Sequence, residues 1–134
     1  MTMNHHGVVH FDIPATDPEK LSQFYTQLFG WKIEKMQMGD TEYWVTNTVP
    51  VGEDFMPAVP GAINGGIYKR QEAQQGPVNY VNVESVDEYV NKARGLGAKV
   101  LMGKMPVPQM GWYALLQDPD GNPFGVWQND MAAS

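Results

Sequence analysis

The pattern of apolar residues predicts a first helix over residues 18–29. Apolar side chains recur there at the i, i+3, i+4, i+7 spacing of one buried helix face: Leu21, Phe24, Tyr25 and Leu28. Asp17 before Pro18 suits the start, because a short acceptor side chain caps free amides and a proline at the first position loses no hydrogen bond. Gly30 suits the end, since a left-handed residue often closes a helix.

A second helix is predicted to begin after Ser85, which has Glu88 three residues later in the pattern of a capping box. Gly95 and Gly97 are expected to end it. Its predicted buried face consists of Val86, Tyr89, Val90 and Ala93.

Short alternating runs around both helices predict strands. In the first half they cover residues 8–13, 31–34, 42–48 and 62–69, and in the second half residues 78–83, 99–102, 112–117 and 123–129. Asp118-Pro119-Asp120-Gly121 has the composition of a type I turn between the last two runs.

The two halves therefore share one order of elements, and a local match supports an internal repeat. Gly30-Trp31-Lys32-Ile33 corresponds to Gly97-Ala98-Lys99-Val100 at an offset of about 67 residues, half of the 134-residue chain. Residues 70–77 form a polar linker between the halves. We predict a single α+β domain over residues 1–134 made of two fused βαβββ modules, at about 7–69 and 77–130.

Composition narrows the possible partners. The net charge is −6 and the nine Lys and Arg residues are scattered, which argues against a nucleic-acid partner because such binding needs a basic stripe. An acidic surface either favours cationic small molecules or keeps the protein soluble. The longest apolar run, residues 112–116, is too short for a membrane span, and no signal-like segment opens the chain, so we expect a cytoplasmic protein. The absence of cysteine excludes disulfides and thiolate chemistry.

Three motifs give the sequence a family resemblance. The first is Val9-His10-Phe11-Asp12-Ile13. The second is the end of the first predicted helix, where Phe24-Tyr25 precedes Leu28-Phe29-Gly30-Trp31. The third is Asp118-Pro119-Asp120-Gly121-Asn122-Pro123-Phe124. Together they resemble the vicinal oxygen chelate superfamily, which includes glyoxalase I, bleomycin-resistance proteins and extradiol dioxygenases, over roughly residues 6–128. The resemblance implies a curved, mostly antiparallel sheet with a cup-shaped cavity, and a homodimer.

Metal enzymes of this family place one His, Glu or Gln on each of four strands, so the resemblance also locates four positions. They fall on His10, within residues 64–66 (Asn-Gly-Gly), on Val78 or Asn79, and on Gly125. Only His10 is a strong ligand, so we predict no metal site and no cofactor. Glycines at the emptied positions are expected to leave room for a larger ligand.

Six residues are predicted to bind a ligand, and none is assigned as catalytic: His10, Asp12, Tyr43, Asn64, Trp112 and Trp127. His10 and Asp12 share a strand face, so they form either an acid–base pair or a structural contact. The aromatic rings either line a pocket or pack against the helices or a partner chain. His5 and His6 are expected to belong to a mobile N-terminus. Residues 49–61 form a long loop that could close over a ligand.

The leading hypothesis is a protein similar to the bleomycin-resistance branch that binds a small aromatic or amphipathic molecule without a full set of metal ligands. The alternative is a metal-dependent glyoxalase-like lyase or isomerase, or a dioxygenase-related enzyme, that uses His10. A pure interaction module is a third possibility, but no specific feature of the sequence favours it. Fold alone does not decide among these functions.

Overall fold

The computed structural model describes residues 5–53, 56–72 and 75–134, and the chain divides into two compact units. Module one contains residues 10–77, and module two contains residues 78–134 together with the segment that precedes His10. Each has the order strand, helix and three strands, which confirms the predicted α+β fold of two βαβββ modules.

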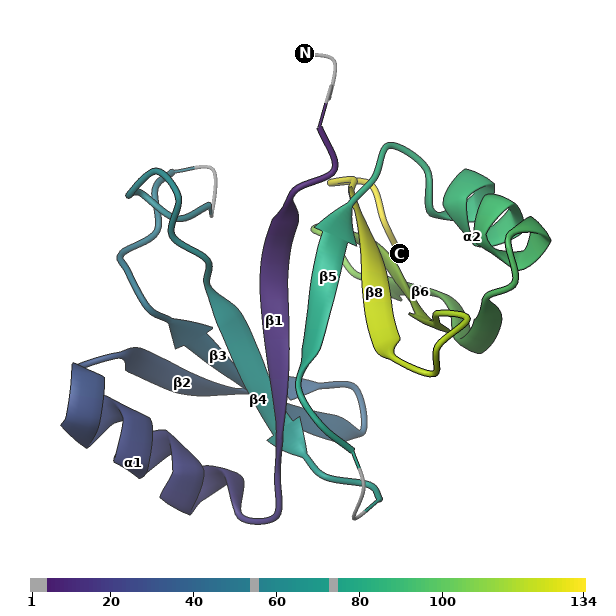
Figure 1. The fold of residues 1–134 in the computed structure, drawn as a ribbon. Coiled ribbons are helices and arrows are strands. Elements are labelled where there is room, and N and C mark those ends of the chain that lie inside the picture. The colour runs from purple at the N-terminus through teal and green to yellow at the C-terminus, as the bar shows by residue number, and fades with distance from the viewer. Residues whose placement is uncertain (1–4, 54–55, 73–74) are drawn as a thin grey trace. The chain divides into compact units, whose positions relative to one another are not determined.

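Module one is built from β1 (Val8–Ala15), α1 (Pro18–Phe29), β2 (Lys32–Met38), β3 (Thr41–Asn47) and β4 (Gly65–Lys69), shown in Figure 1. Its strands lie in the order β2-β3-β4-β1. β1 and β4 are parallel, and the other two pairs are antiparallel. Helix α1 lies on one face of this sheet, and a small hydrophobic core is packed between them. That core contains buried Ala15, Trp44 and Ile67 with the partly buried Ile13, Leu21, Tyr25 and Ile33 packed against it.

Helix α1 begins and ends as predicted, but its buried face is different. The Asp17 side chain accepts a hydrogen bond from the Lys20 amide at 3.2 Å, and Gly30 closes the helix in the left-handed region with φ of 76°. Pro18 and Ser22 are the buried helix residues, whereas Phe24 and Leu28 are 54% and 57% exposed. The predicted apolar stripe is therefore wrong on one side. The helix is rotated so that positions 18, 21, 22 and 25 meet the sheet, and half of the apolar stripe remains outside.

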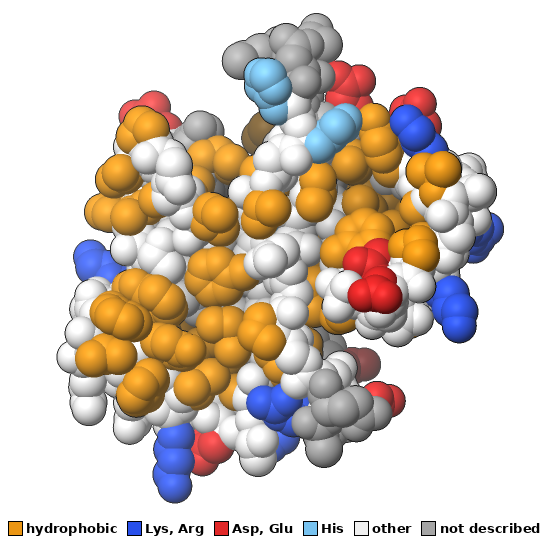
Figure 2. Space-filling view, viewed as in Figure 1, with side chains coloured by type: hydrophobic (Ala, Val, Ile, Leu, Met, Phe, Trp, Pro, Cys, Tyr) orange, Lys and Arg blue, Asp and Glu red, His pale blue; other side chains and the backbone are white. Residues whose placement is uncertain are grey.

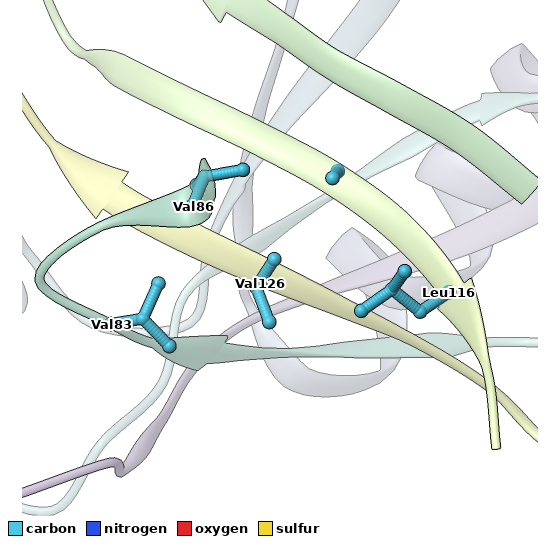
Figure 3. Close-up of a cluster of buried hydrophobic side chains, with 5 residues drawn as sticks. Val83, Val86, Leu116 and Val126 are labelled. Atoms are coloured by element: carbon cyan, nitrogen blue, oxygen red, sulfur yellow. The ribbon is translucent and has the colours of Figure 1, made fainter. Parts of the chain in front are cut away.

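Module two is built from β5 (Val78–Asn82), α2 (Val86–Gly95), β6 (Lys99–Val107), β7 (Gly111–Gln117) and β8 (Pro123–Asn129), with the strand order β5-β8-β7-β6. β5 and β8 are parallel, and the other two pairs are antiparallel. Figure 3 shows side chains of its core, which consists of buried Val83, Val86, Ala114, Leu116 and Val126. The predicted stripe of α2 is confirmed, since Tyr89, Val90 and Ala93 pack against this core. Ser85 caps the helix by accepting from the Glu88 amide at 3.1 Å.

Several strands differ in their bounds from the predictions: β4 begins at Gly65 and not at residue 62, and other strands are longer than predicted. β2 continues to Met38 and β6 to Val107, with register shifts between Val100 and Met105. The predicted turn at residues 118–121 is present: the Gly121 amide donates to the Asp118 carbonyl at 3.0 Å. Among the described residues, no helix is long and apolar enough to cross a membrane.

The N-terminal segment contacts module two, which corrects the expectation for His6. Nδ1 of this histidine lies 2.9 Å from the Asn82 carbonyl oxygen, and its Nε2 lies 2.9 Å from the Tyr89 hydroxyl. The Asn82 amide also donates to the Gly7 carbonyl at 2.9 Å. Residues from His6 onward are therefore anchored to β5 and α2 and are not a free tail.

Candidate functional site

The candidate site lies on the distal face of module one, meaning the side of its sheet that faces away from α1. Trp44 and Ile67 point toward α1. Because side chains alternate along a strand, Tyr43 on β3 and Tyr68 on β4, which are register partners, project from the distal face. His10 and Asp12 on β1 project from the same face, since Ile13 packs toward α1.

Three of the predicted binding residues form one hydrogen-bonded cluster on this face. The Tyr43 hydroxyl donates to Asp12 Oδ1 at 2.5 Å. His10 Nε2 lies 2.8 Å from the Tyr43 oxygen and 3.0 Å from Asp12 Oδ1. The carboxylate is well covered, with its side chain 14% exposed, whereas the imidazole is 36% exposed. The structure therefore brings together residues from two strands that are 31 or more positions apart in the sequence.

The three contacts of this cluster fit one arrangement of hydrogen atoms when the carboxylate is ionised. An ionised carboxylate only accepts hydrogen bonds, so Nε2 of His10 carries the hydrogen that faces Asp12 Oδ1 and the Tyr43 oxygen. Tyr43 gives its own hydrogen to the carboxylate and accepts from the imidazole. The three side chains are thus linked donor to acceptor, and the imidazole is partly accessible to solvent.

Tyr68 is a neighbour of this cluster that the sequence reasoning did not select. Burial raises the pKa of the Tyr68 hydroxyl, the negative charge of Asp12 raises it further, and the Arg70 guanidinium lowers it. Its position two residues after Gly66, one of the candidate positions, was a usable signal because alternate strand residues share a face.

The expectation that glycines leave room for a ligand is wrong for Gly66 and Gly125. A Cβ atom at Gly66 would overlap the hydroxyl end of Tyr43, and one at Gly125 would overlap the ring of Tyr80. Each glycine therefore lies beneath a tyrosine from a strand of its own module, and the aromatic ring takes the space that the missing side chain vacates.

The other predicted binding residues are separated from the cluster in different ways. The Asn64 side chain closes the base of the 49–61 loop: its oxygen accepts from the Thr48 and Val49 amides at 2.7 and 3.1 Å, and its amide donates to the Val49 carbonyl. Trp112 packs against the α2-side core of module two, and its ring nitrogen donates to Asp130 at 3.0 Å.

Trp127 lies on the opposite side of the module-two sheet from Trp112. Its register partner is Tyr113, and its ring lies over Gly111. The indole nitrogen donates to Asn129 Oδ1 at 2.8 Å. The two tryptophans therefore do not share a face, and only Trp127 is on the side of its sheet that faces away from α2.

The order strand, helix and three strands, present twice, is the fold of the glyoxalase-like class of proteins. A family model confirms this assignment over residues 7–126, and the chain belongs to the Glyoxalase/Bleomycin resistance protein/Dioxygenase superfamily.

Similar proteins come from bacteria and a fungus. A "Putative glyoxylase CFP32" of Mycobacterium bovis is 28% identical over 122 residues, 87% of this chain and 43% of that protein. The chain therefore spans less than half the length of this mycobacterial relative. A glyoxylase-like domain-containing protein of Didymella fabae is 27% identical, with 90% of this chain and 93% of that protein covered. Methylmalonyl-CoA epimerase of Mycobacterium tuberculosis shares the fold, with a TM-score of 0.66, 13% identity and coverage of 97% and 93%.

The side chains at the family's metal positions do not fit a divalent metal. Gly66 and Gly125 lie under tyrosine rings, and of the two residues proposed for the third position Val78 is buried and apolar and Asn79 is an exposed amide. The Nε2 atom of His10 already lies within hydrogen-bond distance of Asp12 Oδ1 and the Tyr43 oxygen, so it would have to leave both contacts to bind a metal. Within residues 5–53, 56–72 and 75–134, no three His, Cys, Asp or Glu side chains gather closely enough to hold a metal ion.

Proposed function

We propose that this protein binds a small aromatic or amphipathic molecule at the distal face of module one, without a full set of metal ligands. The observation that carries the proposal is the cluster of His10, Asp12 and Tyr43. It presents a partly exposed imidazole held in place by a covered carboxylate and a phenol. Rigidly held polar groups on an otherwise aromatic and apolar surface are what orients a small ligand.

The chemistry of the cluster favours a ligand with a hydrogen-bonding or cationic group next to a flat apolar body. Asp12 contributes a negative charge, and Tyr43 and Tyr68 contribute rings on the same face. The net charge of −6 adds a weak attraction for cations. Trp112, Trp127 and Asn64 are not part of this site: Trp112 packs against the core of module two, the Trp127 indole donates to Asn129, and Asn64 closes a loop of module one.

The binding test uses proflavine, a planar cation, and acridine, its neutral planar analogue. Both are titrated into ¹⁵N-labelled protein at pH 7.5 and followed by amide chemical shifts. We expect saturable shifts at the amides of residues 10–12, 43 and 66–68, with proflavine binding more tightly. Asp12→Asn and Tyr43→Phe should weaken binding about five- to tenfold, because each removes one partner of a partly buried polar contact.

The matched control is His6→Ala. His6 also contacts a tyrosine hydroxyl and lies near a carbonyl oxygen, but it belongs to module two. This variant should leave proflavine binding unchanged. Binding that is equal in Tyr43→Phe and the parent protein, or shifts confined to other residues, would remove the cluster from the proposal.

Metal content provides the second arm of the test. The purified protein and its His10→Ala variant are analysed by elemental mass spectrometry after incubation with zinc, nickel and manganese. We expect less than 0.1 equivalent of each metal in both proteins. Stoichiometric metal that disappears in His10→Ala would overturn the metal-independent proposal.

The enzyme alternative has one observation in its favour, since the mycobacterial and fungal relatives carry glyoxylase names. The cluster also contains groups able to move protons, namely an imidazole, a carboxylate and a phenol. A glyoxalase assay with and without added divalent metal tests this alternative. Turnover that depends on both metal and His10 would favour it over binding alone.

A cytoplasmic homodimer completes the proposal. Family resemblance supports a dimer. The edge strand β6 also carries three exposed apolar residues, Leu101, Met102 and Met105, which are 53%, 42% and 45% exposed. Light scattering after size-exclusion chromatography should give twice the 15.0 kDa chain mass. A monomer at 100 µM would exclude the dimer, and cell fractionation tests the location.

A further inference from the structure

We propose that module one has a second binding site, on the α1 side of its sheet, for a small amphipathic anion. The site is a cavity of about 480 Å³ between the end of β1, the first two turns of α1 and residues 75–77. It is separate from the His10 cluster, because Ile13 and Ala15 line it and these residues face α1. Its volume lies within the range of about 300–1,000 Å³ found for small-ligand pockets.

The walls of this cavity are largely apolar and aromatic. Helix α1 contributes Leu21, Phe24 and Tyr25, and Pro14 and Pro77 contribute rings from the chain on either side. Phe24 is 54% exposed, which is an unfavourable position for a large apolar side chain in water. Figure 2 shows hydrophobic side chains gathered over α1, with Lys or Arg side chains at the border of that area.

Positive charge gathers at the same cavity in a protein that is acidic as a whole. Lys20 and Arg70 line it, and Lys69 reaches its wall by donating from Nζ to the Thr16 carbonyl at 2.5 Å. Asp17 is the acidic residue among the lining side chains, and one of its oxygens is occupied by the Lys20 amide. The lining residues therefore sum to a local positive charge against a total of −6.

Arg70 is the most informative of these cations. Its guanidinium is partly buried and donates to two backbone carbonyls, those of Pro14 at 3.2 Å and of Gln75. Within the described parts of the chain, neither Arg70 nor Lys20 forms an ion pair with a carboxylate. A partly buried cation without a counter-charge is costly, and an anionic group in the cavity would relieve that cost.

The expected ligand therefore has one anionic head and an apolar body of drug-fragment size. The head would lie at Arg70 and Lys20, and the body against Leu21, Phe24 and Tyr25. The helix N-terminus is not the basis of this assignment, since Asp17 already caps it. The basis is an apolar cavity with two cations that form no ion pair with any carboxylate in the described parts of the chain.

The probe for the test is 8-anilinonaphthalene-1-sulfonate, with uncharged N-phenyl-1-naphthylamine as its matched neutral analogue. Titration of the ¹⁵N-labelled full chain should shift the amides of Thr16, Lys20, Leu21 and Gly76 saturably with the sulfonate. The neutral analogue should bind at least fivefold more weakly. Decanoate and 1-naphthoate are then used as competitors, and the stronger competitor shows whether the site prefers an aliphatic or an aromatic body.

Two pairs of variants separate this cavity from the general apolar surface of α1. Phe24→Ala should raise the Kd about tenfold, whereas Leu28→Ala, which removes an equally exposed residue outside the cavity, should not. Lys20→Gln should raise the Kd about threefold and Lys32→Gln should leave it unchanged. Arg70 is not substituted, because its backbone hydrogen bonds make it structural.

Three outcomes would overturn the proposal. They are shifts spread along α1 that Leu28→Ala weakens as much as Phe24→Ala, equal affinity for the neutral analogue, and no saturable shift at up to 5 mM probe. None of these outcomes affects the proposed function at the distal face, since the reporter amides and variants of the two sites do not overlap.

Discussion

The two modules share one order of elements, yet the sides of their sheets that face away from the helices differ in chemistry. In module one that side carries the hydrogen-bonded cluster of His10, Asp12 and Tyr43. In module two the corresponding side presents buried Tyr80 packed edge to face with Tyr113, and Trp127 over Gly111. One module therefore supplies polar, proton-carrying groups, and the other supplies aromatic surface.

The two modules nevertheless share one packing feature on these faces. In both modules the last strand has a glycine beneath a tyrosine: Gly66 under Tyr43, and Gly125 under Tyr80. The first tyrosine meets its glycine with the hydroxyl end, and the second meets it with the base and edge of the ring. The same packing of a tyrosine over a glycine thus holds a hydroxyl in a polar cluster in module one and a buried ring against Tyr113 in module two.

The largest expected effect comes from adding a methyl group at these glycines. Gly125→Ala should lower the free energy of unfolding by about 3 kcal/mol, because the Tyr80 ring is buried and has little space to move. Gly66→Ala should cost about 1–2 kcal/mol, because Tyr43 is only partly buried and its far end can swing away. Urea unfolding followed by far-ultraviolet circular dichroism measures both values.

Gly103→Ala is the control, since nothing lies near the position of its added Cβ. Its free energy of unfolding should stay within about 0.5 kcal/mol of the parent value. Gly66→Ala should in addition abolish proflavine binding, whereas Gly103→Ala should not. Equal destabilisation by Gly66→Ala and Gly125→Ala would mean that the two tyrosines are held alike and would remove the contrast between the modules.

The next largest effect is the loss of unfolding free energy when a helix N-cap residue is replaced, and the two helices are expected to differ in this loss. Asp17→Ala should cost about 1 kcal/mol, because the carboxylate both accepts from the Lys20 amide and places a negative charge at the start of α1. Ser85→Ala removes the acceptor of the Glu88 amide and should cost about 0.5 kcal/mol, because another amide at this helix start, that of Val86, keeps its own acceptor, Gln128 Oε1, at 2.9 Å. The urea midpoint of each variant gives the difference.

Asp17→Asn is the matched control for the first cap, since it keeps the acceptor and removes the charge. It should lose about half of the effect of Asp17→Ala. A double variant of Ser85→Ala and Gln128→Ala should cost more than the sum of its single changes, because the two acceptors support each other at one helix end. Simple additivity would show that the Gln128 contact does not compensate for the lost cap.

Local sequence rules predicted the elements well, because each depends on contacts within a few residues. The Asp17 and Ser85 caps, the left-handed Gly30 and the turn at residues 118–121 were all predictable from neighbouring residue types. The side of α1 that is buried could not be predicted in this way, because the apolar stripe of residues 21–28 is wider than the area that the sheet covers. Which half of the stripe is buried depends on how the helix is rotated against β3 and β4.

The candidate site was predictable only as far as strand alternation reaches. His10 and Asp12 could be paired because they lie two residues apart on one strand, and the cluster contains both. The contact with Tyr43 depends on the strand order β3-β4-β1 and on Gly66, which lets the ring cross the intervening strand. Reading Gly66 and Gly125 as empty space failed because the rings that fill them come from other strands.

The smallest expected effect is a contrast in pH dependence. In module two, hydrogen bonds from the backbone and side chain of Asn122 hold the pKa of Asp118 below its ordinary value of 3.8, and the Ala132 amide and Trp112 indole lower the pKa of Asp130. A carboxyl whose pKa is lowered by folding stabilises the protein above its unfolded pKa, and this stability is lost as the pH falls through the folded pKa. In module one, burial raises the pKa of Tyr68 above 10.0, so its contribution is present below pH 10 and is lost at higher pH.

Urea midpoints measured from pH 2.5 to 11 test this contrast. Asp118→Asn keeps one acceptor oxygen and should flatten the decline in stability below pH 4, with no change above pH 9. Tyr68→Phe should flatten the decline above pH 10, with no change below pH 5. If Asp118→Asn left the acidic limb as steep as in the parent protein, the amide donors around residue 118 would not be the source of the acid sensitivity. The chemical asymmetry of the modules would then be confined to their helix-free faces.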